Sequence, residues 1–516
     1  MLGRFLFCVS AIMLCAAWPG WAEPTFVRGE PAGPYVGLTE ADFASARSFR
    51  SDEVVLATTY FYWYDSNSGE NWVYADGATT LTHHPVPSSD YSYRSVEWHK
   101  RQMRDIAAAG IDVILPVYWG DPNRRALWSF VGLQKLVQAQ QEMVAAGEPV
   151  PRIGLFHAAI SLEWGPQGPV DLTLPYGREW FYTTIRDFWS QVPPSRWAML
   201  DGKPLVFLYA AFFAKAHDQS CVEFVRSEFA RDFAGRTPYL VRGDGWNLET
   251  ESQYSWGGAV GPRLRHTAAL GPGYDHSAVK GREPLVVDRE HGAFYSRAWE
   301  MLLRLRPERR PRLVHLETWN ELHEATELCE TVECGRRYIE LTRHYGDLYR
   351  AGVRLPRQGA YAAAGEVRWD PSRELEAGLR HDPGVGDGPT APGVRGGRAC
   401  RVALPTSFGL VRYLYFQVED SFAFDEGAPF AVRVVYYDEG DGLVQLQYDS
   451  DDPQGSVVEG AFKAGGDLRL GDSHTWQGHV FHVPDARFVN RTHGCDFRLA
   501  VLGGGLAVAA VSAVRE

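Results

Sequence analysis

Between residues 54 and 352 the chain repeats one pattern, in which a short apolar segment is followed by a longer segment with helical spacing. This alternation predicts parallel strands joined by crossover helices, because a parallel connection needs about a dozen residues or more. Eight strands are expected, the number with which a (β/α)8 barrel closes. They are residues 54–64, 111–119, 152–158, 204–209, 239–242, 255–260, 267–271 and 313–319.

Helices are expected in most of the connections, at residues 96–109, 127–146, 178–190, 221–233 and 293–305. The connections after the fifth and sixth strands are weak, since residues 244–254 are too few for a full helix. The expected fold is therefore α/β, a (β/α)8 TIM barrel. An imperfect barrel and an open doubly wound sheet are the alternatives.

A second domain is expected because 516 residues exceed what one hydrophobic core usually fills. After a Gly/Pro-rich stretch at residues 382–397, segments such as 444–449 alternate with period two. We expect the barrel domain in residues 23–355, a linker and the start of the second domain in 356–400, and a smaller all-β, jelly-roll-like sandwich in 401–516. The strands expected there are residues 411–418, 430–437, 475–483 and 497–501.

The amino terminus has the layout of a signal peptide, with Arg4, an apolar run and then Gly20 and Ala22. We expect cleavage of residues 1–22, a secreted or periplasmic protein, and no membrane insertion after cleavage. The net charge of −12 without a basic run argues against a nucleic-acid partner. Nothing in the sequence indicates an oligomer, so a monomer is expected.

Export would permit disulfides. Two of the seven cysteines lie in the expected signal, and pairing of the others cannot be fixed from sequence. Our interpretation pairs Cys329 with Cys334 and Cys400 with Cys495, and it leaves Cys221 as a buried free thiol.

Polar and aromatic residues follow the expected strands, where a barrel of this kind places its reactive groups. Aromatic residues make up 13% of the chain and suit stacking on sugar rings, although large cores need them equally. The expected substrate-binding residues are Tyr60, Trp63, Asp65, His84, Tyr118, Trp119, His157, Tyr209, Asp244, Trp246, Tyr274, Asp275, Trp319, Asn320 and His323.

Glu321 and Glu324 follow the last strand and are the candidate catalytic pair. Side chains three apart on a helical turn lie about 5 to 6 Å apart at Cβ, and retaining glycosidases hold two carboxyl groups about 5 to 5.5 Å apart. The spacing alone is equally typical of a solvated helix, so the position after the last strand supplies most of the argument.

Dispersed segments resemble glycoside hydrolase family 99, family 71 and an uncharacterised neighbouring barrel family. The resemblance covers about residues 54–352. Its segments are Trp63-Tyr-Asp65, Leu81-Thr-His-His-Pro85, Trp98-His-Lys-Arg-Gln-Met-Arg-Asp105, Gly271-Pro-Gly-Tyr-Asp275, Gly281-Arg282 and Thr318-Trp-Asn-Glu-Leu-His-Glu-Ala-Thr326.

The resemblance implies retaining, endo-acting hydrolysis of α-linked oligo- or polysaccharides, of mannan or glucan type, without a metal or other cofactor. It implies that Glu321 deprotonates the 2-hydroxyl of the substrate and that Glu324 is the acid/base. Leu322 and Ala325 depart from the family, which usually has an aromatic residue or Gly and then Gly at these places. A barrel that binds carbohydrate without catalysis is therefore the alternative.

A metal site built from His83, His84 and His157 with Glu321 or His323 is not expected. Two adjacent histidines on a loop cannot easily share one ion, and the sequence has no H-E-x-x-H motif. The sandwich may be read as a carbohydrate-binding domain or as a structural support, and the sequence does not decide between the two.

Overall fold

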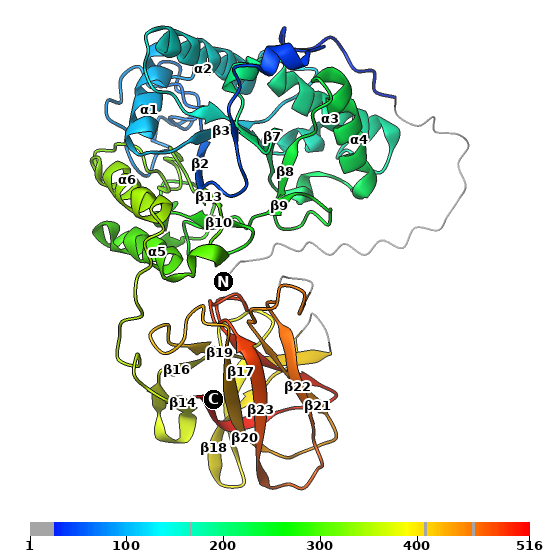
Figure 1. Ribbon diagram of the computed structural model, residues 1–516, viewed down its shortest axis with the longest axis vertical. Helices are drawn as coiled ribbons and strands as arrows, with labels where there is room; N and C mark the ends of the chain where they lie inside the picture. Colours follow the sequence, from blue (N-terminus) through cyan, green and yellow to red (C-terminus); the bar gives the residue numbers. More distant parts are fainter. Residues whose placement is uncertain (1–24, 166, 407–409, 457–459) are drawn as a thin grey trace. The chain divides into compact units, whose positions relative to one another are not determined.

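The computed structural model describes residues 25–165, 167–406, 410–456 and 460–516 (Figure 1). These divide into a barrel unit, which ends at Val353, and a sandwich unit, which contains Arg354–Glu516 together with Arg304–Arg309. The expected signal peptide lies outside the described residues. No helix in the described ranges is long and apolar enough to cross a membrane.

The barrel unit is built on a curled parallel sheet, whose strands follow one another in the order β9-β8-β7-β5-β3-β2-β13-β10. Strands such as β2 and β3 are buried along their whole length, as expected where both faces of a parallel sheet are covered. The bounds are β2 (Val55–Tyr60), β3 (Val113–Tyr118), β4 (Arg152–Ile153), β5 (Leu155–His157), β7 (Lys203–Leu208), β8 (Tyr239–Arg242), β9 (Ser252–Gln253), β10 (Thr267–Leu270) and β13 (Leu313–Leu316).

Helices follow most of these strands, and all except the last lie close to where the sequence predicts them. They are α1 (Val96–Ala108), α2 (Trp128–Ala145), α3 (Pro175–Trp189), α4 (Gln219–Asp232), α5 (Ala293–Arg304) and α6 (Arg337–Arg350). Shorter elements of the unit are β1 (Ser48–Phe49), β6 (Met199–Leu200), β11 (Tyr274–Asp275), β12 (Val286–Val287) and 3-10 helices at Glu40–Phe43, Ile160–Trp164, Pro194–Arg196, Ala211–Phe213 and Glu290–Gly292.

The expected closed barrel is not what the structure shows. Across the described residues, β9 and β10 are the two ends of the parallel order and share no backbone ladder. The sixth strand lies at Ser252–Gln253 rather than at residues 255–260, and no α-helix follows β8 or β9. Instead the connection folds back, so that Arg263 and Ala269 exchange two backbone hydrogen bonds. The gap between β9 and β10, called the seam below, is bridged by the hydroxyls of Ser252 and Thr267 at 2.9 Å.

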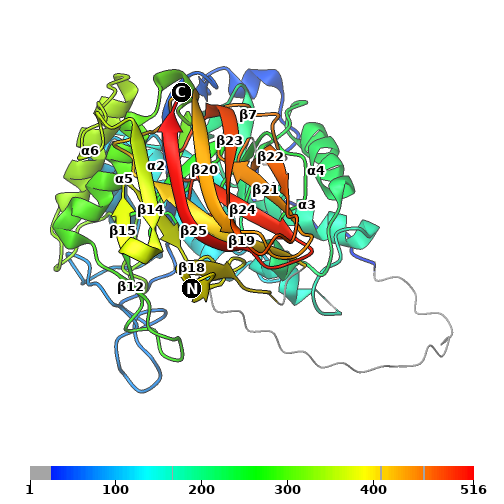
Figure 2. The same ribbon diagram turned by 90° about the horizontal axis from the view of Figure 1, so that it is seen from below.

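The sandwich unit has two antiparallel sheets, of seven and five strands. Figure 2 shows β14, β25, β20 and β23 of the larger sheet side by side. The larger sheet contains β14 (Glu366–Asp370), β15 (Leu375–Ala377), β17 (Thr390–Arg395), β18 (Arg398–Ala403), β20 (Ala428–Tyr437), β23 (Trp476–Ala486) and β25 (Ala507–Arg515), and the smaller one β16 (Leu379–Asp382), β19 (Val411–Val418), β21 (Leu443–Tyr448), β22 (Lys463–Arg469) and β24 (Phe497–Leu502).

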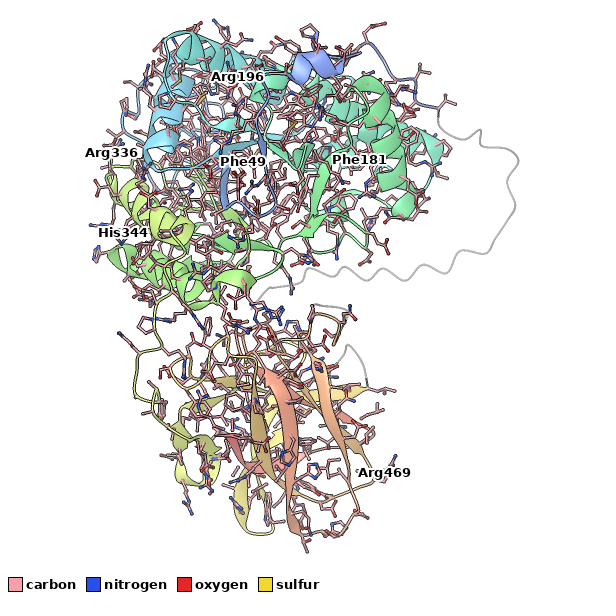
Figure 3. All side chains as sticks on the ribbon, in the orientation of Figure 1. Phe49, Phe181, Arg196, Arg336, His344 and Arg469 are labelled. Carbon is pink, nitrogen blue, oxygen red and sulfur yellow. The ribbon has the colours of Figure 1, made fainter. Side chains whose placement is uncertain are left out.

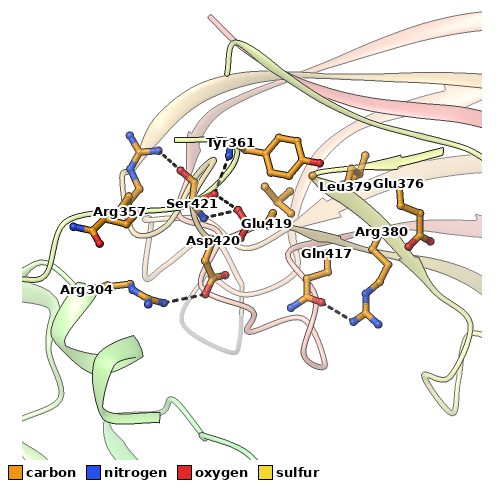
Figure 4. A pocket seen from close by; sticks show the side chains of 13 residues that line it. Arg304, Arg357, Tyr361, Glu376, Leu379, Arg380, Gln417, Glu419, Asp420 and Ser421 are labelled. Carbon is orange, nitrogen blue, oxygen red and sulfur yellow. Dashed lines mark hydrogen bonds and ion pairs between the residues drawn. The ribbon is translucent and has the colours of Figure 1, made fainter. Parts of the chain in front are cut away.

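Alternate residues of these strands form the core between the two sheets, among them Trp369, Phe416, Phe430 and Phe497. A pocket of about 440 Å³ lies in the same unit (Figure 4). Its polar side chains already bond to neighbours, since Gln417 accepts from Arg380 at 2.6 Å and Glu419 accepts from the backbone of Ser421 at 2.8 Å. None of the expected site residues lines this pocket.

Candidate active site

The segment after β13 carries both candidate glutamates. The strand ends at Leu316, and residues 322–325 form a turn rather than the expected helix. The amide of Thr326 donates to the carbonyl of Glu321 at 3.2 Å, and Ala325 has a left-handed φ of 44°. A left-handed residue favours glycine. Position 325 of this turn is therefore one at which glycine would be the favoured residue.

Glu321 is buried beside a tyrosine and a histidine. Its Oε1 accepts hydrogen bonds from the Tyr64 hydroxyl at 3.4 Å and the His323 amide at 3.1 Å, and it lies 3.3 Å from His323 Nδ1. Its Oε2 has no hydrogen-bond partner in the described parts of the chain. Burial raises the pKa of Glu321, the charge of Glu324 adds to the increase, and His323 opposes it. Oε1 of Glu321 is thus held in place, and Oε2 is available for a further hydrogen bond.

His323 is oriented from both sides of its ring. Its Nε2 lies 2.9 Å from the carbonyl of Asn71, while Nδ1 faces Glu321. Both neighbours are acceptors, so a doubly protonated ring satisfies both. Although burial opposes it, the negative charge of Glu321 raises the pKa of His323. Expected as a substrate ligand, His323 here positions Glu321.

Glu324 is half-buried and forms an ion pair with Arg282. Its backbone carbonyl accepts from the amide of Asp275 at 2.9 Å. Burial, with the nearby charges of Glu324 and Glu317, raises the pKa of Tyr209 to about 12. The hydroxyl of Tyr274 is 2.9 Å from His276 Nδ1. Burial and the charge of Glu324 raise the pKa of Tyr274. Tyr209, Tyr274 and Glu324 thus share one region.

Partly exposed tryptophans lie near the carboxyl ends of the first strands. The ring centroid of Trp63 is 5.7 Å from that of His323 and 5.8 Å from that of Trp119, which in turn lies 5.9 Å from Trp164. Trp256 lies 5.1 Å from Tyr209. These rings offer flat apolar surface of the kind that sugars stack on.

Several expected ligands point instead toward the helices or the core, because successive side chains of a strand alternate between its faces. Tyr60 contacts His99 of α1 at 2.9 Å, and His157 contacts Thr184 of α3 at 2.7 Å (Figure 3 labels its neighbour Phe181). Trp319 donates to Gln102 of α1 at 2.6 Å. Two further residues of this group are Tyr118, packed on Phe130 and Phe188, and Trp246, which donates to the carbonyl of Tyr209.

Asn320 is fully buried and engaged with the backbone of the first strand's end. Its Oδ1 accepts from the amide of Phe61 at 2.8 Å, and its Nδ2 donates to the carbonyl of Phe61 at 2.7 Å and to the Tyr91 hydroxyl at 3.3 Å. The amide thus acts as a backbone substitute between two strand ends rather than as a free sugar ligand.

The remaining expected ligands bond to residues of their own loop or of a neighbouring segment. Asp65 accepts from the Ser68 hydroxyl at 2.8 Å, and Asp275 accepts from the Ser277 amide at 2.8 Å. Asp244 accepts from Gln253 at 3.2 Å, and His84 is exposed and pairs with Glu333 at 2.8 Å. The contact of Asp275 is typical of turns, in which an Asx side chain bonds to the backbone two residues on.

A cluster with metal-ligand chemistry lies next to the turn of residues 322–325. His83, Glu327 and Cys334 each offer one ligand atom within 4.8 Å of the others. Arg289, however, lies 2.8 Å from Glu327 and donates to the carbonyl of Ala325 at 2.6 Å. The guanidinium therefore already supplies the positive charge beside this carboxylate, and it supports the turn.

The expected disulfides are not formed, since all the described cysteines are free. Cys329 is buried, whereas Cys334 faces Arg289 at 3.7 Å. Cys400 lies on β18 of the larger sheet, and Cys495 precedes β24 of the smaller one. The two members of each expected pair thus face different surroundings.

Sequence reasoning missed Tyr64, Arg282 and Glu317 as site residues. The Tyr64 hydroxyl donates to Glu321 and accepts from the amide of Leu322 at 2.9 Å. Glu317 is the first polar residue after β13, and that position was the available signal.

Three solved structures illustrate the similarity to known proteins. The GH99 endo-α-mannosidase from Bacteroides thetaiotaomicron is similar at 15% identity and a TM-score of 0.40, over 58% of this chain and 98% of that one. A glycoside hydrolase-like protein has 13% identity and a TM-score of 0.40, over 59% and 98%. The C-terminal CBM6 of LamC, a laminarinase from Zobellia galactanivorans, has 9% identity and a TM-score of 0.18, over 29% and 99%. No curated protein matches the sequence.

A protein family matches the barrel unit by sequence. The match spans residues 56–360 and thus more than half of the chain. It includes the strands and the turn that carry Glu317, Glu321 and Glu324. The chain belongs to this family, which is described as a domain of unknown function (DUF5010).

Proposed function

We propose that the barrel unit is a retaining glycosidase that cleaves α-linked glycans, of mannan or glucan type, internally. The observation that carries the proposal is the turn after β13. It holds Glu321, whose buried Oε2 has no hydrogen-bond partner among the described residues, close to the half-buried Glu324. The rings of Trp63, Trp119 and Tyr209 supply stacking surface nearby. Two carboxyl groups and aromatic rings are the parts that glycoside hydrolysis requires.

The unpartnered oxygen of Glu321 suits the role of base toward the sugar 2-hydroxyl. In the first step Glu321 takes the proton of that hydroxyl, and the freed oxygen attacks C1 while the bond to the leaving oxygen breaks. Glu324 gives its proton to the leaving oxygen. Water then adds to C1 and opens the three-membered ring. Glu324 takes the proton of the water, Glu321 returns its proton to the 2-oxygen, and two displacements retain the configuration.

Arg282 regulates the second carboxyl in this scheme. Its ion pair with Glu324 must open before Glu324 can donate a proton to a leaving oxygen. The guanidinium is about half exposed, so it can turn toward solvent or toward a sugar hydroxyl. We propose that substrate entry makes this exchange.

The test compares wild type, Glu321→Gln and Glu324→Gln on linear α-mannans and α-glucans, with the exposed Glu249→Gln as the matched control. We expect each site variant to lose at least about 100-fold in kcat/KM, within the range of one general acid or base, and the control to match wild type. On an aryl glycoside with an acidic phenol as leaving group, Glu324→Gln should recover and Glu321→Gln should not. Full activity of both site variants on the glycans would refute the proposal.

The alternative is a barrel that binds carbohydrate without cleaving it. Leu322 and Ala325 favour it, since both depart from the related hydrolases, and Arg282 occupies Glu324. Binding to a glycan array without products would support it. Export with removal of residues 1–22 and glycan binding by the sandwich unit are further parts of the proposal, and amino-terminal sequencing and binding by the full chain test them.

A further inference from the structure

Glu317 is a third carboxyl next to the catalytic turn, and the scheme above does not use it. It directly follows β13, four positions before Glu321, and is 1% exposed. A buried carboxyl is costly unless its oxygens are satisfied. Its two oxygens therefore indicate what it does.

One oxygen of Glu317 is held by the backbone. Oε2 accepts from the amide of Gly257 at 2.9 Å, and the amides of Gly258 and Ala259 also hydrogen-bond to the carboxyl. Gly257 has a φ of 106°, a conformation that glycine adopts readily. Successive amides that converge in this way bind oxygen atoms of anions and carboxyl groups. They fix the carboxyl and leave Oε1 pointing elsewhere.

The other oxygen of Glu317, Oε1, has no hydrogen-bond partner among the described residues, and the same is true of Nδ1 of His315, which faces it. Oε1 lies 3.7 Å from His315 Nδ1, too far for a hydrogen bond. The opposite nitrogen of His315 is 2.6 Å from the Thr59 hydroxyl, which fixes the ring. The rings of Phe207 and Trp256 lie 5.2 and 5.9 Å from that of His315. These two rings thus pack on His315, whose Nδ1 faces the oxygen of Glu317 that lacks a partner.

The protonation state makes this oxygen a donor. Burial raises the pKa of Glu317 to about 8 and lowers the pKa of His315 to about 3. At neutral pH the carboxyl therefore mainly carries its proton, and the imidazole is neutral. Since Oε2 accepts the amides, the proton belongs on Oε1. Among the described residues, the other charged or titratable groups that face Glu317 are Arg263, Tyr209 and Tyr254, and burial raises the pKa of both tyrosines.

Tyr209 connects this carboxyl to the proposed catalytic pair. The charges of both Glu317 and Glu324 act on its hydroxyl, and its ring lies 5.1 Å from that of Trp256. Carboxyl ends of parallel strands meet at the mouth of such a sheet. Glu317 therefore lies at the same end of the sheet as the proposed catalytic pair, close to where the glycan is expected.

We propose that Glu317 is a substrate-binding residue that donates a hydrogen bond from Oε1 to a hydroxyl oxygen of the bound sugar, while Gly257 and His315 hold it in place. The proposal rests on the proposed glycan specificity, but it does not depend on cleavage. A carboxyl that only capped residues 257–259 would use Oε2 and gain nothing from an unpartnered Oε1.

The test uses the full chain and a glycan selected from the α-mannan and α-glucan panel. Glu317→Gln keeps an oxygen for Gly257 and an N–H in place of the acid proton, whereas Glu317→Leu removes both. Glu249→Gln is the matched control. Binding is measured by calorimetry from pH 6 to 9, and thermal melting checks that each variant is folded.

We expect wild-type affinity to fall about tenfold between pH 7 and 9, as a group with a pKa near 8 loses its proton. Glu317→Gln should bind within about threefold of wild type at pH 7 and lose this alkaline decline, because its donor does not titrate. Glu317→Leu should bind at least about tenfold more weakly, the loss of one hydrogen bond. The control should behave as wild type.

An unchanged alkaline decline in Glu317→Gln would overturn the proposal, even if Glu317→Leu is unfolded. Binding with the expected pH dependence but without cleavage would support Glu317 and refute the hydrolase. Cleavage with a pH-independent affinity would do the reverse. A chain that binds none of the glycans would overturn both.

Discussion

Replacing Asn320 by Ala separates a structural role for this amide from a role in binding. The side chain is fully buried and forms hydrogen bonds of 2.8 and 2.7 Å with the amide and carbonyl of Phe61. Removing it leaves two buried backbone groups without partners. Each such group costs about 1 to 3 kcal/mol. We therefore expect the free energy of unfolding to fall by about 2 to 6 kcal/mol.

Urea unfolding followed by tryptophan fluorescence measures this change. The signal reports mainly on the barrel unit, because Trp369 and Trp476 are the only described tryptophans of the sandwich unit. Asn123→Ala is the matched control, since Asn123 is exposed and its loss should alter stability by less than about 0.5 kcal/mol. If Asn320→Ala were within 1 kcal/mol of wild type and lost glycan affinity, the structural reasoning would be refuted.

Two further predictions concern the turn and the response to acid. Ala325→Val should destabilise the protein by about 2 kcal/mol or more, because a β-branched residue at a φ of 44° is an outlier. Ala325→Gly should melt close to wild type. Equal melting temperatures of the two variants would contradict the left-handed turn. Burial lowers the pKa of His99 to about 3 and of His157 to about 4, so both are neutral when folded and gain protons on unfolding. The stability they contribute is present above pH 6.5 and is lost as the pH falls toward 4, by about 1.4 kcal/mol per pH unit and group. His157→Gln should reduce the slope of unfolding free energy against pH by one such step, and an unchanged slope would be evidence against a neutral buried ring.

Most strand positions of the barrel unit could be predicted from the sequence, but the strand ends and the closure of the sheet could not. The apolar run that starts at Val54 reads as one strand to Tyr64, yet the ladder stops at Tyr60. Beyond it the aromatic residues bond to distant elements, as Tyr62 does to the carbonyl of Ser129. Those partners lie far away in sequence. No local pattern shows them.

The candidate site was predicted in its position and only partly in its geometry. Glu321 and Glu324 do lie together after the last strand, and the helical turn expected between them is replaced by a turn with Ala325 in a left-handed conformation. Which aromatic residues at a strand end face the interior of the sheet depends on the register of the strand, as Tyr60 and Trp63 illustrate. The catalytic and binding roles of these residues stay predictions.

The hydrogen bond between Glu317 and Gly257 has a second consequence because of its place at the seam. Glu317 follows β13, whereas Gly257 follows β9, so their hydrogen bond spans from one side of the seam to the other. A ligand that binds more tightly when this hydrogen bond is formed must, by thermodynamic linkage, also stabilise the hydrogen bond itself. A glycan that binds to Glu317 would then also hold together two edges of the sheet that backbone pairing leaves apart.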